Sequence, residues 1–138
     1  MEFNFSTAQR IIFGWHTLNE LPSIIKEYGS RALIIYSRSV TAITKIENYF
    51  NEINIEYYSS AIHGEPTDEV INRVTAEARK FKCDFVLGIG GGSVLDTGKA
   101  VSSLITNEGD LLDYLEVVGK GLPIKNSPKP YIAIPTTA

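Results

Sequence analysis

The fold is decided by the stretch Phe85-Val86-Leu87-Gly88-Ile89-Gly90-Gly91-Gly92-Ser93-Val94-Leu95-Asp96-Thr97-Gly98-Lys99-Ala100. It starts with an apolar run that predicts a buried strand, continues through three glycines that predict a sharp turn, and then opens a helix at Ser93. Ser93 is a candidate helix N-cap, and Asp96 three residues later resembles a capping box with Asp in place of Glu. A strand, a glycine-rich turn and a helix in this order predict one unit of an alternating α/β fold.

The same loop is a candidate phosphate site. Glycine allows a positive φ and leaves no Cβ in the path of a ligand. The N–H groups at the start of a helix carry partial positive charge, which favours a phosphate or pyrophosphate there. The alternative is a tight structural turn, in which case Asp96, Lys99 and Ser103 only form a solvated stripe on the helix. The junction of a strand with a helix favours the phosphate interpretation.

Two familiar phosphate motifs do not fit this loop. The G-x-G-x-x-G fingerprint requires glycine where Ser93 stands. The Walker A pattern requires four residues between its glycines and Ser or Thr after the lysine, but five residues separate Gly92 from Gly98 and Ala100 follows Lys99. A standard Rossmann dehydrogenase and a P-loop NTPase are therefore not supported.

Apolar runs and helix-period stretches alternate along the rest of the chain. Further strands are expected at 32–36, 53–57 and 131–134, with one more at 6–13, and helices at 18–28, 43–50 and 68–81. Thr67 is the expected N-cap of the last of these helices. Strands separated by helices predict a Rossmann-like parallel sheet with helices on both faces. Residues 107–129, with several glycines and prolines and a short helical piece at 111–115, are expected to run over the surface.

Composition restricts the class of protein. The 138 residues carry a formal net charge of -3 and are 43% hydrophobic, as expected for one globular domain. The slight acidity offers no basic surface for nucleic acid, no apolar run is long enough to span a membrane, and the start lacks a secretory signal. A cytoplasmic location is therefore expected. The only cysteine, Cys83, excludes an intrachain disulfide and a cysteine-based metal site, and His16 and His63 have no metal-ligand spacing.

Four segments together resemble one enzyme family. Residues 90–99 are similar to the GGGSxxDxxK signature of the iron-containing (group III) alcohol dehydrogenases. Ile11-Ile12-Phe13-Gly14 resembles that family's opening strand and turn, and Gly64-Glu65-Pro66-Thr67 resembles the loop before its third helix. Ile134-Pro135-Thr136-Thr137-Ala138 resembles the start of its IPTTAGTGSE segment. The resemblance covers essentially the whole chain.

The resemblance implies two domains, of which this chain holds one. Residues 1–138 would form a dinucleotide-binding domain, dehydroquinate synthase-like in fold, whose cofactor is NADP or NAD. A helical C-terminal domain would hold iron, or another divalent metal, through one Asp and three His. That domain is absent from this chain, whose last strand is followed at once by the end of the sequence.

The complete enzyme would transfer hydride between a small alcohol or aldehyde and the nicotinamide. The 138 residues alone would bind no metal and would be inactive. A relative of glycerol dehydrogenase or dehydroquinate synthase is an alternative within the enzymes, and a non-catalytic nucleotide-binding module is an alternative outside them. Assembly into a homo-oligomer stays open.

Carried over residue by residue, the resemblance implies a cofactor site and no catalytic or metal-binding residue in this chain. In this interpretation the pyrophosphate is bound by Gly91, Gly92 and Ser93, the nicotinamide side of the cleft is bordered by Asp96 and Lys99, and the groove is lined by Thr136 and Thr137.

The choice between the two cofactors is expected to depend on the end of the strand 32–36. Tyr36-Ser37-Arg38-Ser39 lacks the carboxylate that would accept hydrogen bonds from the ribose hydroxyls and repel a 2′-phosphate. The hydroxyl of Ser37 and the guanidinium of Arg38 are suited to a 2′-phosphate, so a modest preference for NADP over NAD is expected. The alternative is that Arg38 points to solvent and that Ser39 is only the N-cap of the next helix.

Overall fold

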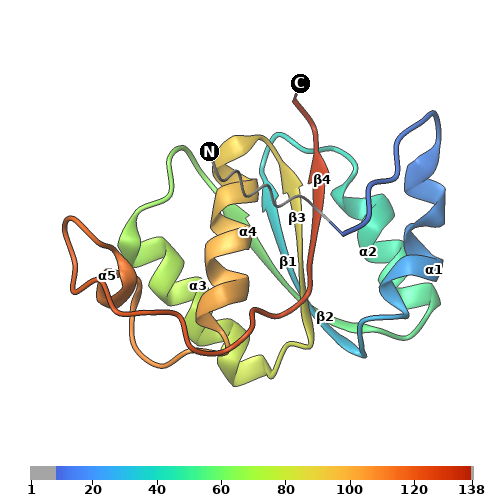
Figure 1. Ribbon diagram of the computed structural model, residues 1–138. Helices are drawn as coiled ribbons and strands as arrows, with labels where there is room; N and C mark the ends of the chain where they lie inside the picture. Colours follow the sequence, from blue (N-terminus) through green and yellow to red (C-terminus); the bar gives the residue numbers. More distant parts are fainter. Residues whose placement is uncertain (1–8, 138) are drawn as a thin grey trace, which may run out of the picture.

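The computed structural model describes residues 9–137, which form a four-stranded parallel sheet between two layers of helices (Figure 1). The strands are β1 (Arg31–Ser37), β2 (Glu56–Ile62), β3 (Phe85–Gly90) and β4 (Tyr131–Pro135), arranged in the order β2-β1-β3-β4. Every neighbouring pair is parallel. The expected Rossmann-like α/β class is confirmed. The connection from β1 leads to β2 on one side of it, and the connection from β2 leads to β3 on the other side of β1. The two crossovers therefore diverge between β1 and β3.

β1 and β3 form the centre of the sheet because their side chains are apolar on both faces. The segment 32–35 of β1 and all of β3 are buried. Parallel strands that are covered by helices on both faces have near-continuous apolar sequences. The strands at 32–36 and 85–89 were predicted from such continuous apolar runs.

Each face of the sheet has its own hydrophobic core (Figure 1). On one face lie α1 (Leu21–Ile25) and α2 (Ile43–Glu52), where Ile46 and Phe50 are fully buried. On the other lie α3 (Asp68–Phe81) and α4 (Gly92–Leu104), where Val74 and Val101 are fully buried. Successive residues of β1 belong alternately to the two cores, because side chains in a strand alternate between its faces.

The structure confirms the predicted start of α3. Thr67 Oγ1 accepts a hydrogen bond from the Val70 N–H at 3.2 Å, so the threonine is the N-cap. Asp68 and Glu69 place negative charge in the first turn, at the positive end of the helix dipole. The helix ends at Phe81 and is followed by the C-cap Lys82, whose φ of 57° is left-handed, as is common after a helix.

Three predictions of secondary structure are wrong in part. The strand expected at 53–57 lies at Glu56–Ile62, because Ile53 is the C-cap of α2 and Asn54 has a left-handed φ of 58°. The helix expected at 18–28 is a 3₁₀ turn, η1 (Thr17–Glu20), followed by the short α1. A proline in the first turn of α1 suits a separate helix start. Residues 9–13 form no strand, and residues 6–8 lie outside the described part of the chain.

Residues 107–129 run over the surface, as expected, and include α5 (Leu111–Tyr114) beside α3 (Figure 1). The buried side chain of Asn107 holds this segment in place. Its Oδ1 accepts the N–H groups of Lys125 and Asn126 at 3.1 and 3.0 Å, and its Nδ2 donates to the Asn126 carbonyl at 3.2 Å. Arg79 of α3 donates to carbonyls at the end of α4 and in the segment itself, those of Leu104, Asn107 and Gly109.

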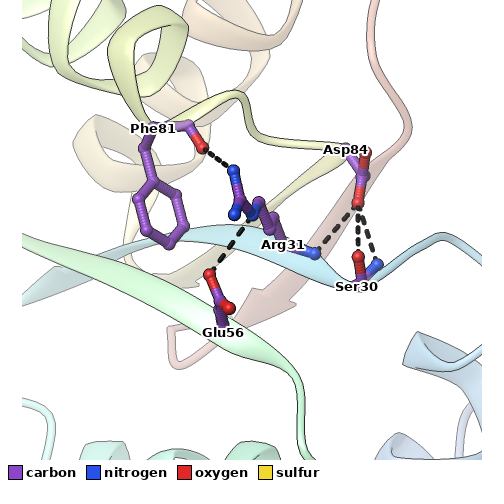
Figure 2. Close-up of polar contacts among 5 residues, drawn as sticks. All are labelled: Ser30, Arg31, Glu56, Phe81 and Asp84. Atoms are coloured by element: carbon purple, nitrogen blue, oxygen red, sulfur yellow. Dashed lines mark hydrogen bonds and ion pairs between the residues drawn. The ribbon is translucent and has the colours of Figure 1, made fainter.

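A polar cluster holds the amino ends of β1, β2 and β3 together (Figure 2). Asp84 Oδ2 accepts the N–H groups of Ser30 and Arg31 at 2.8 and 2.9 Å. The Arg31 guanidinium lies 3.2 Å from the Glu56 carboxylate and 5.7 Å from the centre of the Phe81 ring. These contacts join the strands to the end of α3. They lie at the amino ends of the strands, and the glycine-rich loop lies at the opposite, carboxyl ends.

Cys83 lies next to this cluster and is buried. Burial, followed by the nearby Asp84 carboxylate, raises the pKa of the thiol from 9.0 to about 11. Because the thiolate is the reactive form, Cys83 is expected to react with a disulfide reagent at pH 8 at least about tenfold more slowly in the folded chain than in urea. Equal rates in the two conditions would contradict the buried thiol.

The same shift predicts a pH dependence of stability. The folded chain keeps the Cys83 proton up to about pH 11, whereas the unfolded chain releases it near 9.0. The free energy of unfolding is therefore expected to fall as the pH rises through this window. Urea unfolding at both ends of the window measures the fall, which should be smaller in Cys83→Ala.

Candidate functional site

The carboxyl ends of β1, β2 and β3 surround a groove of about 180 Å³. Ser37 ends β1, Ile62 ends β2, and Gly64 lies two residues after Ile62. The remaining lining comes from the loop after β3 and the start of α4, residues 91–94. The groove lies where the crossovers diverge, which is the position at which open parallel sheets bind ligands.

The helix that borders the groove starts one residue earlier than expected. Gly91, in an extended conformation, is the N-cap of α4, and its carbonyl accepts the N–H groups of Val94 and Leu95, each at 3.1 Å. Ser93 therefore lies inside the first turn, and its prediction as the N-cap of a capping box with Asp96 is wrong. The amides of Gly92 and Ser93 come before Val94, whose amide is the first to donate within the helix, so they have no acceptor there.

The glycines of the loop serve different needs. A Cβ on Gly92 would meet no atom within 4 Å, and this residue has no positive φ, so glycine here leaves space in front of the helix. A Cβ on Gly90 would lie 2.9 Å from the Val94 side chain, so packing requires glycine at that position. The expected positive φ is absent from Gly91 and Gly92, both of which belong to the described residues. Neither a steric contact nor a positive φ therefore requires glycine at position 92.

The end of β4 brings Thr136 and Thr137 to the same loop, but neither is among the residues that line the groove, so their predicted role in lining it stays a prediction. The Thr136 N–H donates to the Gly90 carbonyl at 3.0 Å. Thr137 Oγ1 lies 3.5 Å from the position of a Cβ on Gly91. Both threonine side chains are exposed beside the groove, and Ala138, the last residue of the matching segment, lies outside the described residues.

Ser37 and Arg38 are the two residues predicted to select the cofactor, and of these only Ser37 lines the groove. Its Oγ lies 2.9 Å from Ser39 Oγ. Arg38 is exposed beside it and, within residues 9–137, forms no ion pair. The alternative role of Ser39 as a helix cap is wrong, because the N-cap of α2 is Ala42. No carboxylate belongs to the part of the groove lining that the structure describes.

Asp96 and Lys99 lie farther along α4, where both are exposed. They are not among the residues that line the groove, and the described structure contains no ion pair between them. Their assignment to the nicotinamide side stays a prediction.

The prediction missed three groove residues, Ile62, Gly64 and Val94. With the strand expected at 53–57, its carboxyl end falls too early in the chain to reach the groove. The segment 64–67, already noted for its resemblance, was the available signal for Gly64.

A wider and more open hollow of about 620 Å³ lies at the opposite end of the sheet, between Asn51, Glu56 and Phe81. Its lining comes from the end of α2, the loop after it, the start of β2 and the end of α3, and Arg31 already pairs with the Glu56 carboxylate and covers the Phe81 ring (Figure 2). The smaller groove is therefore the candidate site.

The part of the chain that the structure describes does not bring together a set of side chains suited to a metal ion. Residues 9–137 contain no group of three or more His, Cys, Asp or Glu side chains arranged to hold a metal ion. In the same part of the chain, no helix is long and apolar enough to cross a membrane.

Comparison with known proteins connects this geometry to a family. Residues 8–138 match the family model described as iron-containing alcohol dehydrogenase. The chain is 33% identical to long-chain-alcohol dehydrogenase 1 of Geobacillus thermodenitrificans, covering 96% of this chain and 36% of the relative. It is 32% identical to an alcohol dehydrogenase of Thermococcus barophilus, covering 100% of this chain and 38% of the relative. The chain thus spans little more than a third of these relatives.

Solved structures share the fold over almost the whole chain. A 1,3-propanediol oxidoreductase superposes with a TM-score of 0.86 at 25% identity, covering 99% of this chain and 36% of that one. The NADH-dependent butanol dehydrogenase A of Thermotoga maritima superposes with a TM-score of 0.82 at 26% identity, covering 98% and 34%. Since sequence model, relatives and structures agree over the same residues, the chain belongs to the iron-containing alcohol dehydrogenase family.

Proposed function

We propose that this chain is the dinucleotide-binding domain of an NAD(P)-dependent alcohol dehydrogenase and that the cofactor lies in the groove at the carboxyl ends of β1, β2 and β3. The observation that carries the proposal is the free space in front of Gly92, at the start of α4 and between three strand ends. A pyrophosphate there would accept hydrogen bonds from the amides of Gly92 and Ser93 and would face the positive end of the helix dipole.

The neighbouring residues support the same assignment. Gly91 follows the strand without a side chain, and the Ser93 hydroxyl lies next to the pyrophosphate position. Ser37, at the end of β1, takes the adenosine ribose, and Thr136 and Thr137 form the wall on the β4 side. When bound, the nicotinamide supplies the hydride acceptor or donor. The name of one similar structure, an NADH-dependent butanol dehydrogenase, supports a nicotinamide cofactor.

The complete enzyme requires residues beyond this domain. The described residues offer no metal site, and the chain spans little more than a third of its relatives. We propose that a further, helical domain holds the iron, or another divalent metal, and completes the site for an alcohol or aldehyde. The relatives' names range from long-chain alcohols to sulfoacetaldehyde, so the substrate class stays at that level. Homo-oligomerisation and a cytoplasmic location stay predictions.

Titration calorimetry of the chain with NADP(H) and NAD(H) tests the proposal. Binding of both is expected, with NADP(H) about fivefold tighter, because one added charge-assisted contact to the 2′-phosphate contributes about 1 kcal/mol. Ser37→Asp is expected to reverse the order, since a carboxylate accepts from the ribose hydroxyls and repels the phosphate. Ser23→Asp, which adds the same charge on the distant helix α1, is the matched control.

The outcomes separate two claims. An absence of binding heat from either cofactor would contradict the proposed function. A preference for NAD(H) that Ser37→Asp does not change would contradict only the role of the β1 end in selecting the cofactor.

A further inference from the structure

Tyr131, the first residue of β4, connects that strand to the helix that borders the groove. Its hydroxyl donates to the Leu95 carbonyl at 2.9 Å, and its side chain packs in the core formed by α3 and α4. Leu95 directly follows the residues of α4 that line the groove. In the helix the Leu95 carbonyl is already the acceptor for the Lys99 amide. The phenol is therefore not required to satisfy a buried acceptor.

The ring occupies space that two glycines leave free. A Cβ on Gly88 of β3 would lie 2.5 Å from the Tyr131 hydroxyl oxygen. A Cβ on Gly98 of α4 would lie 2.6 Å from the Tyr131 ring. At both glycines the nearest atoms all belong to Tyr131. β3 and α4 therefore each have a glycine at the position where the Tyr131 ring lies between them.

From these contacts we infer that Tyr131 is a positioning residue for the cofactor groove. The ring sets the separation of α4 from β3, and the hydroxyl holds the first turn of α4 through the Leu95 carbonyl. The amides of Gly92 and Ser93 are thereby kept facing the groove. This inference rests on the proposed function, because it concerns the same groove. Burial and the nearby Asp96 carboxylate raise the pKa of the Tyr131 phenol above its ordinary value of 10.0, so the hydroxyl keeps its proton, and remains a donor, well above neutral pH.

Tyr131→Phe tests the inference because it removes the hydroxyl and keeps the ring. We expect NAD(P)(H) to bind about fivefold more weakly, which corresponds to the loss of about one net hydrogen bond. Amide hydrogen exchange at Val94 and Leu95, whose N–H groups donate to the Gly91 carbonyl, is expected to accelerate in the same variant. Tyr114→Phe is the matched control, since the Tyr114 hydroxyl also donates to a backbone carbonyl, that of Glu108, but in the surface segment.

Unchanged affinity in Tyr131→Phe would overturn the inference. An equal loss of affinity in Tyr114→Phe would also overturn it, because the cause would then be general destabilisation. If the unaltered chain binds neither cofactor, the proposed function fails and the exchange measurement decides alone. Acceleration at Val94 and Leu95 confined to Tyr131→Phe would then support the positioning role, and unchanged exchange would overturn it.

Discussion

Replacing Gly92 with valine is expected to abolish binding of NAD(P)(H) and to change the free energy of unfolding by no more than about 0.5 kcal/mol. The added Cβ meets no atom within 4 Å, and the backbone at Gly92 has no positive φ, so the folded chain tolerates a side chain there. The same side chain fills the space in front of the amides of Gly92 and Ser93, where the pyrophosphate is proposed to lie. Titration calorimetry and urea unfolding of the same protein measure the two effects.

Gly92→Ala provides a graded control, since a single methyl group blocks less of the space and should leave weakened binding. Unaltered affinity in the valine variant would place the cofactor elsewhere. Loss of the fold together with binding would restore the interpretation of the glycine cluster as a structural turn.

Replacing Gly98 with leucine is expected to lower the free energy of unfolding by about 3 kcal/mol, at the upper end of the usual cost of overpacking a core. The first carbon of the new side chain would lie 2.6 Å from the Tyr131 ring, and both α4 and Tyr131 pack in the hydrophobic core under α3 and α4, so a shift of either would disturb that core. Urea unfolding monitored by circular dichroism measures the loss.

Tyr131→Ala in the same background is the control, because it removes the ring that the leucine strikes. The double variant is expected to be more stable than the sum of the two single losses predicts, by at least about 1 kcal/mol. Strict additivity would show that the leucine and the ring do not compete for the same space.

Local features made part of this structure predictable. β1 and β3 are recognisable because burial on both faces of a parallel sheet demands continuous apolar runs. Thr67 marks the start of α3 because a cap bonds to an amide only three residues away. The strand, glycines and helix at 85–100 are likewise contiguous, so the sequence predicted both the class of fold and the loop that faces the groove.

Local patterns misled where two structures compete for the same residues. Ile53, Ile55 and Tyr57 alternate like a strand, yet the chain is still closing α2 there, and the Ile55 amide donates to the Phe50 carbonyl at 3.0 Å. The real β2 is an edge strand whose Ser59-Ser60-Ala61 carries a weak apolar pattern. Because the end of β2 was misplaced, Ile62 and Gly64 were not assigned to the groove.

The sequence by itself determined the parallel α/β fold, the glycine-rich loop at 90–93 that borders the groove and the family resemblance, since each depends on residues close together along the chain. Only the tertiary structure decided which distant residues meet. The order β2-β1-β3-β4 brings Ser37 and Ile62 to the start of α4 and places Tyr131 between Gly88 and Gly98. Strand order and the separation of a helix from its sheet arise from packing between segments tens of residues apart, and no short sequence pattern records that packing.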